Sequence, residues 1–173
     1  MAYTFLLAKG YSIGKSVRDL SRLDNIRQYL EEASNYSTKI FLPRDVIVCD
    51  ELDYPTEIKT VPVTEIGDEH VGVDIGEETI EIYKKILSQS EQVIWQGPLG
   101  VFEMKEFENG TREIARHLIE EEIYTIIGGG DSAAAFEKFG FQDEVSFIST
   151  GGGASLEVMR GVLLPAIECL SDK

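Results

Sequence analysis

The sequence is short of positive charge: 16 Lys and Arg stand against 31 Asp and Glu, which gives a formal net charge of -15 at pH 7. Proteins that bind nucleic acids neutralise the phosphate backbone with clustered Lys and Arg. We therefore expect no nucleic-acid partner. An anionic ligand of this chain would need a metal ion or backbone amides to offset its charge.

Long apolar runs and paired cysteines are also missing. No apolar run approaches the roughly 18 residues of a transmembrane helix, and the start of the chain does not resemble an export signal. Cys49 and Cys169 lie far apart in sequence and lack metal-ligand spacing, which suits a reducing compartment and favours inert thiols. These features predict a cytoplasmic protein without a membrane partner, and the length of 173 residues is that of one globular domain.

The first half of the chain shows helical and then strand-like patterns. From Val17 to Ala33, apolar residues recur every three or four positions, which predicts a helix with one buried face. The segments KIFLPRDVIVCDEL and EIKTVPVTEIG are rich in β-branched residues and are divided by turn residues from Asp53 to Pro55. This middle stretch is predicted to form strands.

From Gly76 onward the pattern alternates. The helical periods EETIEIYKKIL and TREIARHLIEE are interleaved with the short apolar runs QVIWQG, IYTIIGGG and VSFISTGGG. Runs that are apolar on both faces and alternate with amphipathic helices indicate a parallel sheet covered by helices on both sides. The predicted fold class is therefore α/β.

Two of these runs end in the same way, with three glycines and the start of a helix. We name them the first glycine junction, IIGGGDSAAA, and the second glycine junction, ISTGGGASLE; they lie 23 residues apart. Glycine lets backbone amides approach an anion, and a helix N-terminus favours phosphate. Together the junctions could hold one polyphosphate. The alternative is a pair of tight turns capped by Asp131 and Ser155.

Neither junction fits the common nucleotide-binding signatures. The chain has no G-x-x-x-x-G-K-[ST] motif, and neither triplet belongs to a dinucleotide fingerprint, so a dinucleotide oxidoreductase is a distant alternative. Neither junction carries a lysine. A cation that stabilises a transferred phosphoryl group must therefore lie elsewhere.

Three motifs carry a family resemblance. WQGPLGVFE, IIGGGDSAAA and STGGGASLE, in this order and spacing, resemble the C-terminal, nucleotide-binding half of phosphoglycerate kinase. The segments MAYTFLLAKGYSIGKS, LPRDVIV and GVDIGEET are similar to intervening parts of that family. The resemblance implies a partial, doubly wound, mostly parallel Rossmann-like sheet. It also implies that residues 1–173 form an incomplete nucleotide-binding domain without the N-terminal phosphoglycerate-binding domain.

The resemblance also implies an activity. The family transfers a phosphoryl group between 1,3-bisphosphoglycerate and ADP in glycolysis, giving 3-phosphoglycerate and ATP, with Mg²⁺ as cofactor. ATP or ADP would be the direct partner of this chain, and the phosphoglycerate would bind through the absent domain. We expect the isolated chain to be inactive, and a non-catalytic nucleotide-binding module is the alternative.

Carried onto this sequence, the family's adenine pocket falls on Gly72, Val73, Gly97, Pro98, Val101 and Phe102. The apolar members of this set could equally be ordinary core residues. Glu103 matches the acid that binds the ribose, although a solvated glutamate is the plain alternative. Gln96 departs from the asparagine usual in the W-N-G-P motif, and its added methylene displaces the amide.

The phosphate-binding residues fall on the two glycine junctions. Asp131 matches the residue that places Mg²⁺ on the nucleotide phosphates, a role that suits a hard oxygen ligand, and a helix N-cap is compatible with it. Gly129, Gly130 and Ser132 would cradle the phosphates. The backbone amides of Gly151, Gly152 and Gly153 would face the transferred group, with Gly129 beside them.

The family's strand order, 3-2-1-4-5-6, predicts which strands this chain contains. By resemblance KIFLP is strand 3, while QVIWQ, IYTII and VSFIS are strands 4, 5 and 6. Strands 1 and 2 have no counterpart in the sequence. We therefore expect strand 3 to lack a neighbour and strand 4 to present an open edge. This would make the chain marginally stable or prone to self-association, unless strand 3 and its helix collapse onto strand 4.

Overall fold

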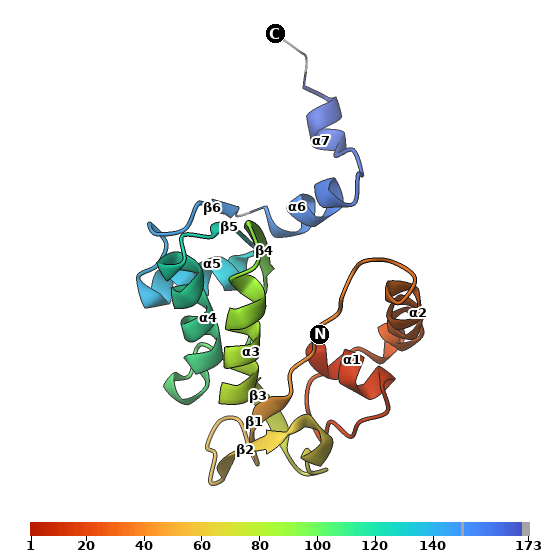
Figure 1. Cartoon of the computed structure of the whole chain (residues 1–173), viewed down its shortest axis with the longest axis vertical. Helices are drawn as coiled ribbons and strands as arrows, with labels where there is room; N and C mark the ends of the chain where they lie inside the picture. The colour runs from red at the N-terminus through yellow and green to blue at the C-terminus, as the bar shows by residue number, and fades with distance from the viewer. Residues whose placement is uncertain (150, 171–173) are drawn as a thin grey trace. The chain divides into compact units, whose positions relative to one another are not determined.

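The protein is described by a computed structural model that covers residues 1–149 and 151–170. Thr150 of the second glycine junction and residues 171–173 lie outside the described residues. The chain divides into two compact units: unit 1 comprises Met1–Tyr83 and Leu99–Gly110, and unit 2 comprises Lys84–Pro98 and the chain from Thr111 onward (Figure 1). Within the described part of the chain, no helix is both long and apolar enough to cross a membrane.

Unit 1 is built on a three-stranded antiparallel sheet. Its strands are β1 (Asp45–Cys49), β2 (Ile58–Pro62) and β3 (Val71–Ile75), in the order β2-β1-β3. The central strand β1 is buried along most of its length because it pairs on both edges. The prediction of strands in the middle stretch is thus confirmed for β1 and β2, whereas their antiparallel pairing was not predicted.

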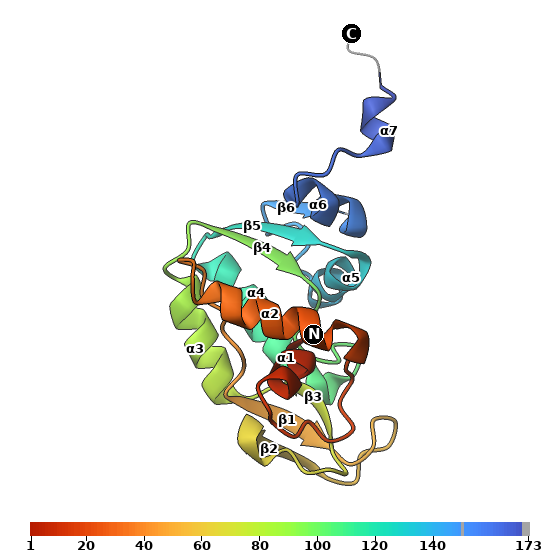
Figure 2. The ribbon, with the colours of Figure 1, turned by 90° about the vertical axis from the view of Figure 1, so that its right-hand side faces the viewer.

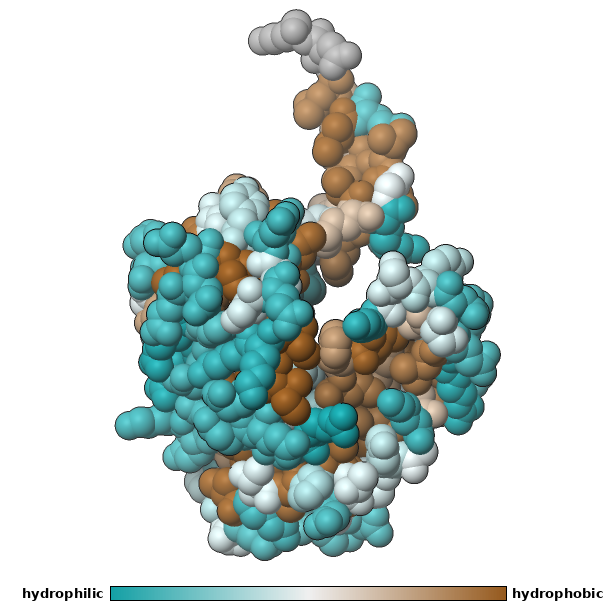
Figure 3. Space-filling model, viewed as in Figure 1, coloured by the Kyte–Doolittle hydropathy of each residue, from teal (hydrophilic) through white to brown (hydrophobic). Residues whose placement is uncertain are grey.

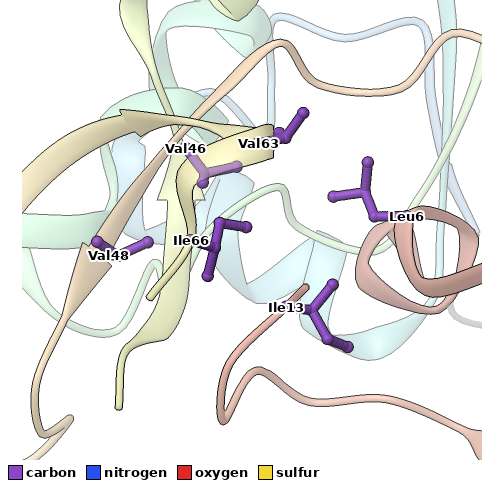
Figure 4. Packing of buried hydrophobic residues seen from close by; sticks show 6 residues of the cluster. All are labelled: Leu6, Ile13, Val46, Val48, Val63 and Ile66. Carbon is purple, nitrogen blue, oxygen red and sulfur yellow. The ribbon is translucent and has the colours of Figure 1, made fainter. Parts of the chain in front are cut away.

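The core of unit 1 lies between this sheet and the N-terminal helix α1 (Ala2–Ala8). Figure 4 shows Leu6 of α1 facing Val46, which lies on β1, and Val63, which follows β2. The full cluster consists of Leu6, Ile13, Val46, Val48, Val63 and Ile66. A second cluster joins Cys49, Val73 and Phe107. Cys49 is therefore a buried thiol, whereas Cys169 is exposed.

The first predicted helix is shorter than expected. A 3₁₀ turn (η1, Leu20–Arg22) precedes α2 (Leu23–Ala33), and Val17 is outside both and 83% exposed. Asp19 causes the late start: its backbone is extended and its carboxylate accepts hydrogen bonds from the amide and hydroxyl of Ser21. This local bonding begins the turn at residue 20, so the prediction was wrong from Val17 to Asp19.

The KIFLP segment, residues 39–43, was predicted as a strand and is not one. Ile40 and Phe41 are exposed, and a hollow of about 530 Å³ is lined by this segment, α1 and the end of β2. A strand is stabilised by the backbone ladder to a neighbour. The structure places β1 directly after this segment instead, where it pairs with β2 and β3.

Unit 2 contains a three-stranded parallel sheet. Its strands are β4 (Gln92–Gln96), β5 (Tyr124–Gly128) and β6 (Phe147–Ser149), in the order β4-β5-β6. Figure 2 shows β4 and β5 side by side and pointing the same way. This confirms the predicted α/β class and the adjacency of the last three strands.

Helices alternate with the strands of unit 2, as the sequence predicts. The remaining helices and 3₁₀ turns are η2 (Val63–Glu65), α3 (Glu77–Leu87), η3 (Lys105–Phe107), α4 (Asn109–Glu120), α5 (Gly130–Phe139), α6 (Gly152–Met159) and α7 (Pro165–Glu168). In unit 2, Lys84 near the end of α3 pairs with Glu113 of α4. Both α5 and α6 begin within the glycine junctions.

The two faces of the parallel sheet differ in burial. Trp95 of β4 and Ile127 of β5 share a buried face, where Phe136 of α5 packs edge-on against the Trp95 ring. On the other face, Ile94 is 49% and Phe147 56% exposed. In the described part of unit 2, α5 covers one face of the sheet closely, and on the other face α6 lines an open hollow beside Ile94 and Phe147.

Candidate functional site

The first glycine junction is a sharp turn between β5 and α5. The strand ends at Gly128, Gly129 has φ 92° and ψ 150°, and the helix starts at Gly130. Residues with a side chain rarely adopt a φ in this range, so Gly129 is required by the backbone. Gly129 is also the N-cap, without a side-chain cap, which corrects the interpretation of Asp131 as the capping residue.

Asp131 lies in the first turn of α5 and is exposed. Among the described residues, its carboxylate has no ion-pair or hydrogen-bond partner that would commit it to a structural role. A carboxylate at this position is stabilised by the positive end of the helix dipole. It is therefore available to a ligand at the helix N-terminus.

The second glycine junction has its own internal hydrogen bonds. Gly151 is the N-cap of α6, and its amide donates to the Ser149 hydroxyl at 3.3 Å. That hydroxyl also lies 2.8 Å from the hydroxyl of Ser155. Ser155 is thus bonded to Ser149 and is not the N-cap, so the predicted cap was wrong. Gly152 and Gly153 are the first two residues of α6.

The two junctions meet in space. A methyl group placed on Gly152 would come within 3.2 Å of the Gly129 Cα atom. This proximity follows from topology, because β5 and β6 are adjacent parallel strands whose carboxyl ends lie at the same edge of the sheet. The structure therefore brings Gly129, Gly130, Asp131 and Gly152 together, as the sequence predicts.

Gln96 covers the first junction from the neighbouring strand. Gln96, the last residue of β4, pairs in register with Gly128, the last residue of β5. A methyl group on Gly128 would lie 2.6 Å from the Gln96 Oε1 atom, and one on Gly129 would lie 2.6 Å from its Nε2 atom. The carboxamide thus lies flat on the two glycines, and its donor and acceptor are held at the edge of the sheet where the junctions meet.

Ser132 joins the first junction to the loop after β4. It is 1% exposed, and its hydroxyl accepts a hydrogen bond from the Gly97 amide at 2.7 Å. The Trp95 indole donates to the Gly97 carbonyl at 2.6 Å, and Gly97 has a φ of 86°. Ser132 therefore holds the Gly97–Pro98 turn, a function that sequence reasoning missed. Its predicted contact with phosphate stays a prediction.

A largely apolar hollow of about 360 Å³ adjoins the junctions on the exposed face of the unit 2 sheet. Gln96, Gly128 and Ser149 form its wall at the carboxyl ends of the strands. The remaining lining residues are Ile94, Ile126, Phe147, Ala154, Ser155, Val158, Met159 and Leu164. Apolar surface thus continues from the exposed sheet face to α6.

The other predicted site residues lie in unit 1. Gly72 donates its amide to the Ser16 hydroxyl at 2.9 Å, and Val73 packs with the buried Cys49–Phe107 cluster. Phe102 is buried as well. These apolar side chains are core residues in this structure, and their predicted contact with a purine stays a prediction. Glu103 is exposed.

Asp74 is a functional candidate that sequence reasoning missed. It is a fully buried carboxylate on β3, and burial raises its pKa to about 6 although hydrogen bonds from the Gly110 and Ile75 amides oppose the shift. The signal was present in the sequence as an acidic residue inside the apolar run VGVDIG. Buried acids are uncommon unless they are hydrogen bonded to fixed donors.

The donor set suits a hard cation shared with a ligand. Among the described residues, no three His, Cys, Asp or Glu side chains gather as a metal site of their own. Mg²⁺ commonly uses one or two carboxylates, and phosphate oxygens and water complete its coordination. Asp131, exposed beside two helix N-termini, fits that pattern.

A parallel α/β sheet with helix N-termini gathered at its carboxyl edge defines a class of proteins that bind phosphate-bearing ligands. The chain belongs to the phosphoglycerate kinase family, whose model matches residues 1–162, and thus to a family of phosphotransferases.

Relatives agree with this assignment. A phosphoglycerate kinase of Finegoldia magna is 42% identical over 173 residues, which are the whole chain and 44% of the relative. The structure of a phosphoglycerate kinase from Coxiella burnetii matches 96% of the chain with a TM-score of 0.91 and 41% identity, and 43% of that protein is covered. The structure of a phosphoglycerate kinase from Pyrococcus horikoshii matches 96% of the chain with a TM-score of 0.78 and 32% identity, and 42% of that protein is covered. The chain thus spans less than half the length of these relatives.

Proposed function

We propose that this chain provides the nucleotide-binding half of a phosphoglycerate kinase. The whole protein would transfer a phosphoryl group reversibly between 1,3-bisphosphoglycerate and MgADP, giving 3-phosphoglycerate and MgATP. One observation carries the proposal: Gly152 of the second junction lies against Gly129 of the first, at the carboxyl edge of a parallel sheet. Two helix N-termini therefore converge on a single place.

The backbone of the two junctions would bind the phosphates. The first amides of α5 and α6 have no partner within their own helices, and the helix dipoles favour negative charge at these ends. Gly130 and Gly153 leave open space where a side chain would stand, so a phosphate can approach the backbone closely. In a chain with a net charge of -15, such fixed dipoles supply attraction that side chains do not.

Asp131 is the residue that would hold the magnesium ion. Bound Mg²⁺ would neutralise part of the phosphate charge and fix the orientation of the phosphate chain. The carboxylate of Asp131 is exposed in the first turn of α5. It can therefore reach a ligand that occupies the helix N-terminus without any change of the backbone.

The nucleoside would be bound by β3 and by the segment that follows β4. Glu103 is the proposed acceptor for the ribose hydroxyls, and Gly72, Val73, Gly97, Pro98, Val101 and Phe102 are the proposed adenine contacts. Exposed carboxylate oxygens can accept bonds from both hydroxyls of a ribose. We assign the phosphoglycerate contacts to the remainder of the whole protein, because relatives are more than twice as long as this chain.

Calorimetric titration with ADP tests the proposal. We expect binding in the presence of Mg²⁺ and at least about tenfold weaker binding with excess chelator, because one charge-assisted contact contributes at least that factor. Asp131→Asn should weaken binding of MgADP and remove most of the magnesium dependence. The matched control is Glu137→Gln, an exposed carboxylate later in the same helix, which should bind as the unaltered chain does.

Three results of this titration would contradict the proposed function. Equal or tighter binding of ADP in excess chelator would exclude the proposed magnesium site. An unchanged affinity in Asp131→Asn would show that this carboxylate does not hold the ion. Absence of binding under every condition would remove the nucleotide-binding function from the isolated chain.

A further inference from the structure

Asp74 holds two backbone amides inside unit 1. It lies on β3 and is 2% exposed. Its Oδ2 atom accepts a hydrogen bond from the Gly110 amide at 2.7 Å, and its Oδ1 atom accepts one from the Ile75 amide at 2.8 Å. Gly110 is 36 residues away in sequence, so this bond fixes the far end of the segment Leu99–Gly110 to the sheet.

The segment is shaped to receive this carboxylate. A methyl group on Gly100 or on Gly110 would overlap the Asp74 side chain. Neither glycine has a backbone conformation that disfavours other residues. Glycine is therefore favoured at both positions by the closeness of Asp74, together with the Phe107 carbonyl at Gly100 and the Ile75 side chain at Gly110. The two ends of the segment close around one carboxylate.

Two further contacts hold the middle of the segment against the same strand. The Val101 amide donates to the Val73 carbonyl at 2.8 Å. Phe107 is fully buried in a cluster with Val73 and Cys49. Val101, Phe102 and Glu103 are thus held between points that all depend on β3.

From this arrangement we infer that Asp74 is a positioning residue for nucleotide binding. Its carboxylate fixes the segment Gly100–Gly110 and so places Val101 and the exposed Glu103 where a nucleoside can be bound. The inference rests on the proposed nucleotide site. Asp74 itself is buried and acts through the segment, without touching the ligand.

The unfavourable free energy of burying this carboxylate supports a positioning role. Burial raises its pKa to about 6, so the ionised form is disfavoured in the folded chain. The Tyr3 hydroxyl of α1 is near enough to interact with Asp74, and the Cys49 thiol of β1 in turn interacts with Tyr3; the pKa of Tyr3 is raised by burial, Asp74 and Cys49. Neither neighbour supplies a positive charge. The carboxylate is thus retained at a cost in stability that its two amide bonds only partly offset.

Amide hydrogen exchange of the ligand-free chain tests the positioning claim. In Asp74→Ala, the amides of Val101–Phe107 and Gly110 should exchange about ten to a hundred times faster, the factor expected for losing one bond to a charged acceptor. The amides of Val46 and Val48 in β1 should change much less. Asp74→Asn keeps an oxygen that can accept from Gly110 and should restore much of the protection.

Asp45→Ala is the matched control for Asp74→Ala. Asp45 is also a buried carboxylate in unit 1; it accepts hydrogen bonds from the Glu78 and Thr79 amides and lies close to Gly76. This variant should loosen the start of α3 and leave Val101–Phe107 protected. Equal loosening of that segment in Asp45→Ala and Asp74→Ala would overturn the inference, as would unchanged exchange in Asp74→Ala.

Ligand selectivity tests the functional consequence. The unaltered chain should bind MgADP more tightly than its 2′,3′-dideoxy analogue, and Asp74→Ala should lose this preference while magnesium pyrophosphate binds within about twofold as before. A retained preference would overturn the inference. Failure of the unaltered chain to bind any of these ligands would sink the proposed function instead, and the exchange result alone would then decide whether Asp74 positions the segment.

Discussion

Gly152 lies against Gly129, so close that a methyl group on Gly152 would be 3.2 Å from the Gly129 Cα atom. These residues belong to different glycine junctions and stand at the starts of two helices. A side chain on Gly152 would be tight against Gly129, and one of the two junctions would have to shift by a few tenths of an ångström. A ligand at this place would therefore meet backbone amides of both helices.

Gly129→Ala should destabilise unit 2. Gly129 has a φ of 92°, and a side chain there would meet the Gln96 carboxamide. We expect the free energy of unfolding to fall by at least about 1 to 2 kcal/mol, the cost of a positive φ for a residue with a Cβ atom. Urea unfolding followed by the fluorescence of Trp95 measures this, because the sole tryptophan is in the same unit.

Gly153→Ala is the comparison for that measurement. It lies in the first turn of α6, its backbone is unstrained, and a methyl group there meets open space. Its unfolding free energy should change by no more than about 1 kcal/mol, and in the stabilising direction. Equal losses in the two variants would contradict the account of why Gly129 is glycine.

The stability of unit 1 should depend on pH through Asp74. Its pKa is raised from 3.8 to about 6 in the folded chain, so the folded state binds the proton more tightly than the unfolded state. The stabilisation of the folded state by this proton is fully present below pH 3.8 and is lost as the pH rises through 6. Between pH 7 and pH 5 it should add about 1 kcal/mol to the free energy of unfolding.

Comparison with Asp74→Asn isolates this contribution. Glu57 and Glu69 have lowered pKa values, because hydrogen bonds from Lys59 and Lys15 stabilise their charged forms, so they act in the opposite direction, mainly below about pH 5. Urea unfolding at both pH values, with a probe in unit 1, gives the difference. An identical pH dependence in the two proteins would show that Asp74 does not titrate in this range.

The chain should self-associate at high concentration. The face of the parallel sheet that contains Ile94 and Phe147 is exposed, and hydrophobic residues cover much of α6 and α7 (Figure 3). Exposed apolar patches and open strand edges favour pairing with another chain. We expect sedimentation above the monomer mass of 19.3 kDa, reduced by Ile94→Thr with Phe147→Thr. A monodisperse monomer at all concentrations would contradict this expectation.

The isolated chain should lack phosphoglycerate kinase activity. Neither glycine junction carries Lys or Arg, and phosphoryl transfer depends on positioning both substrates and stabilising the moving charge. A coupled assay with 3-phosphoglycerate and MgATP should show turnover far below the kinase range of about 1 to 100 per second. Turnover within that range would prove the expectation wrong.

Local patterns in the sequence predicted much of unit 2. The apolar runs that became β4, β5 and β6 are short and continuous, and the helices between them are amphipathic, so their parallel direction follows from general rules for such sheets. Their order was implied by the family resemblance. The glycine junctions were visible for the same reason. Their direct contact through Gly129 and Gly152 follows from adjacent parallel strands.

Unit 1 was harder to predict because its contacts are long-range. The pairing of β1 with both β2 and β3 depends on residues far apart in sequence, and a β-branched run does not reveal its partner. The same limit explains the error at residues 39–43, where strand-like composition is not matched by a backbone ladder. Asp74 was overlooked because only the folded chain brings Gly110 to its carboxylate.

The central claim is that both glycine junctions bind the phosphates of one magnesium nucleotide. Nuclear magnetic resonance of the ¹⁵N-labelled chain, titrated with MgADP, tests it most directly. We predict that the amide signals of Gly129, Gly130, Gly152 and Gly153 shift together, with a single dissociation constant. Shifts confined to one junction, or two junctions that respond with different dissociation constants, would contradict the claim.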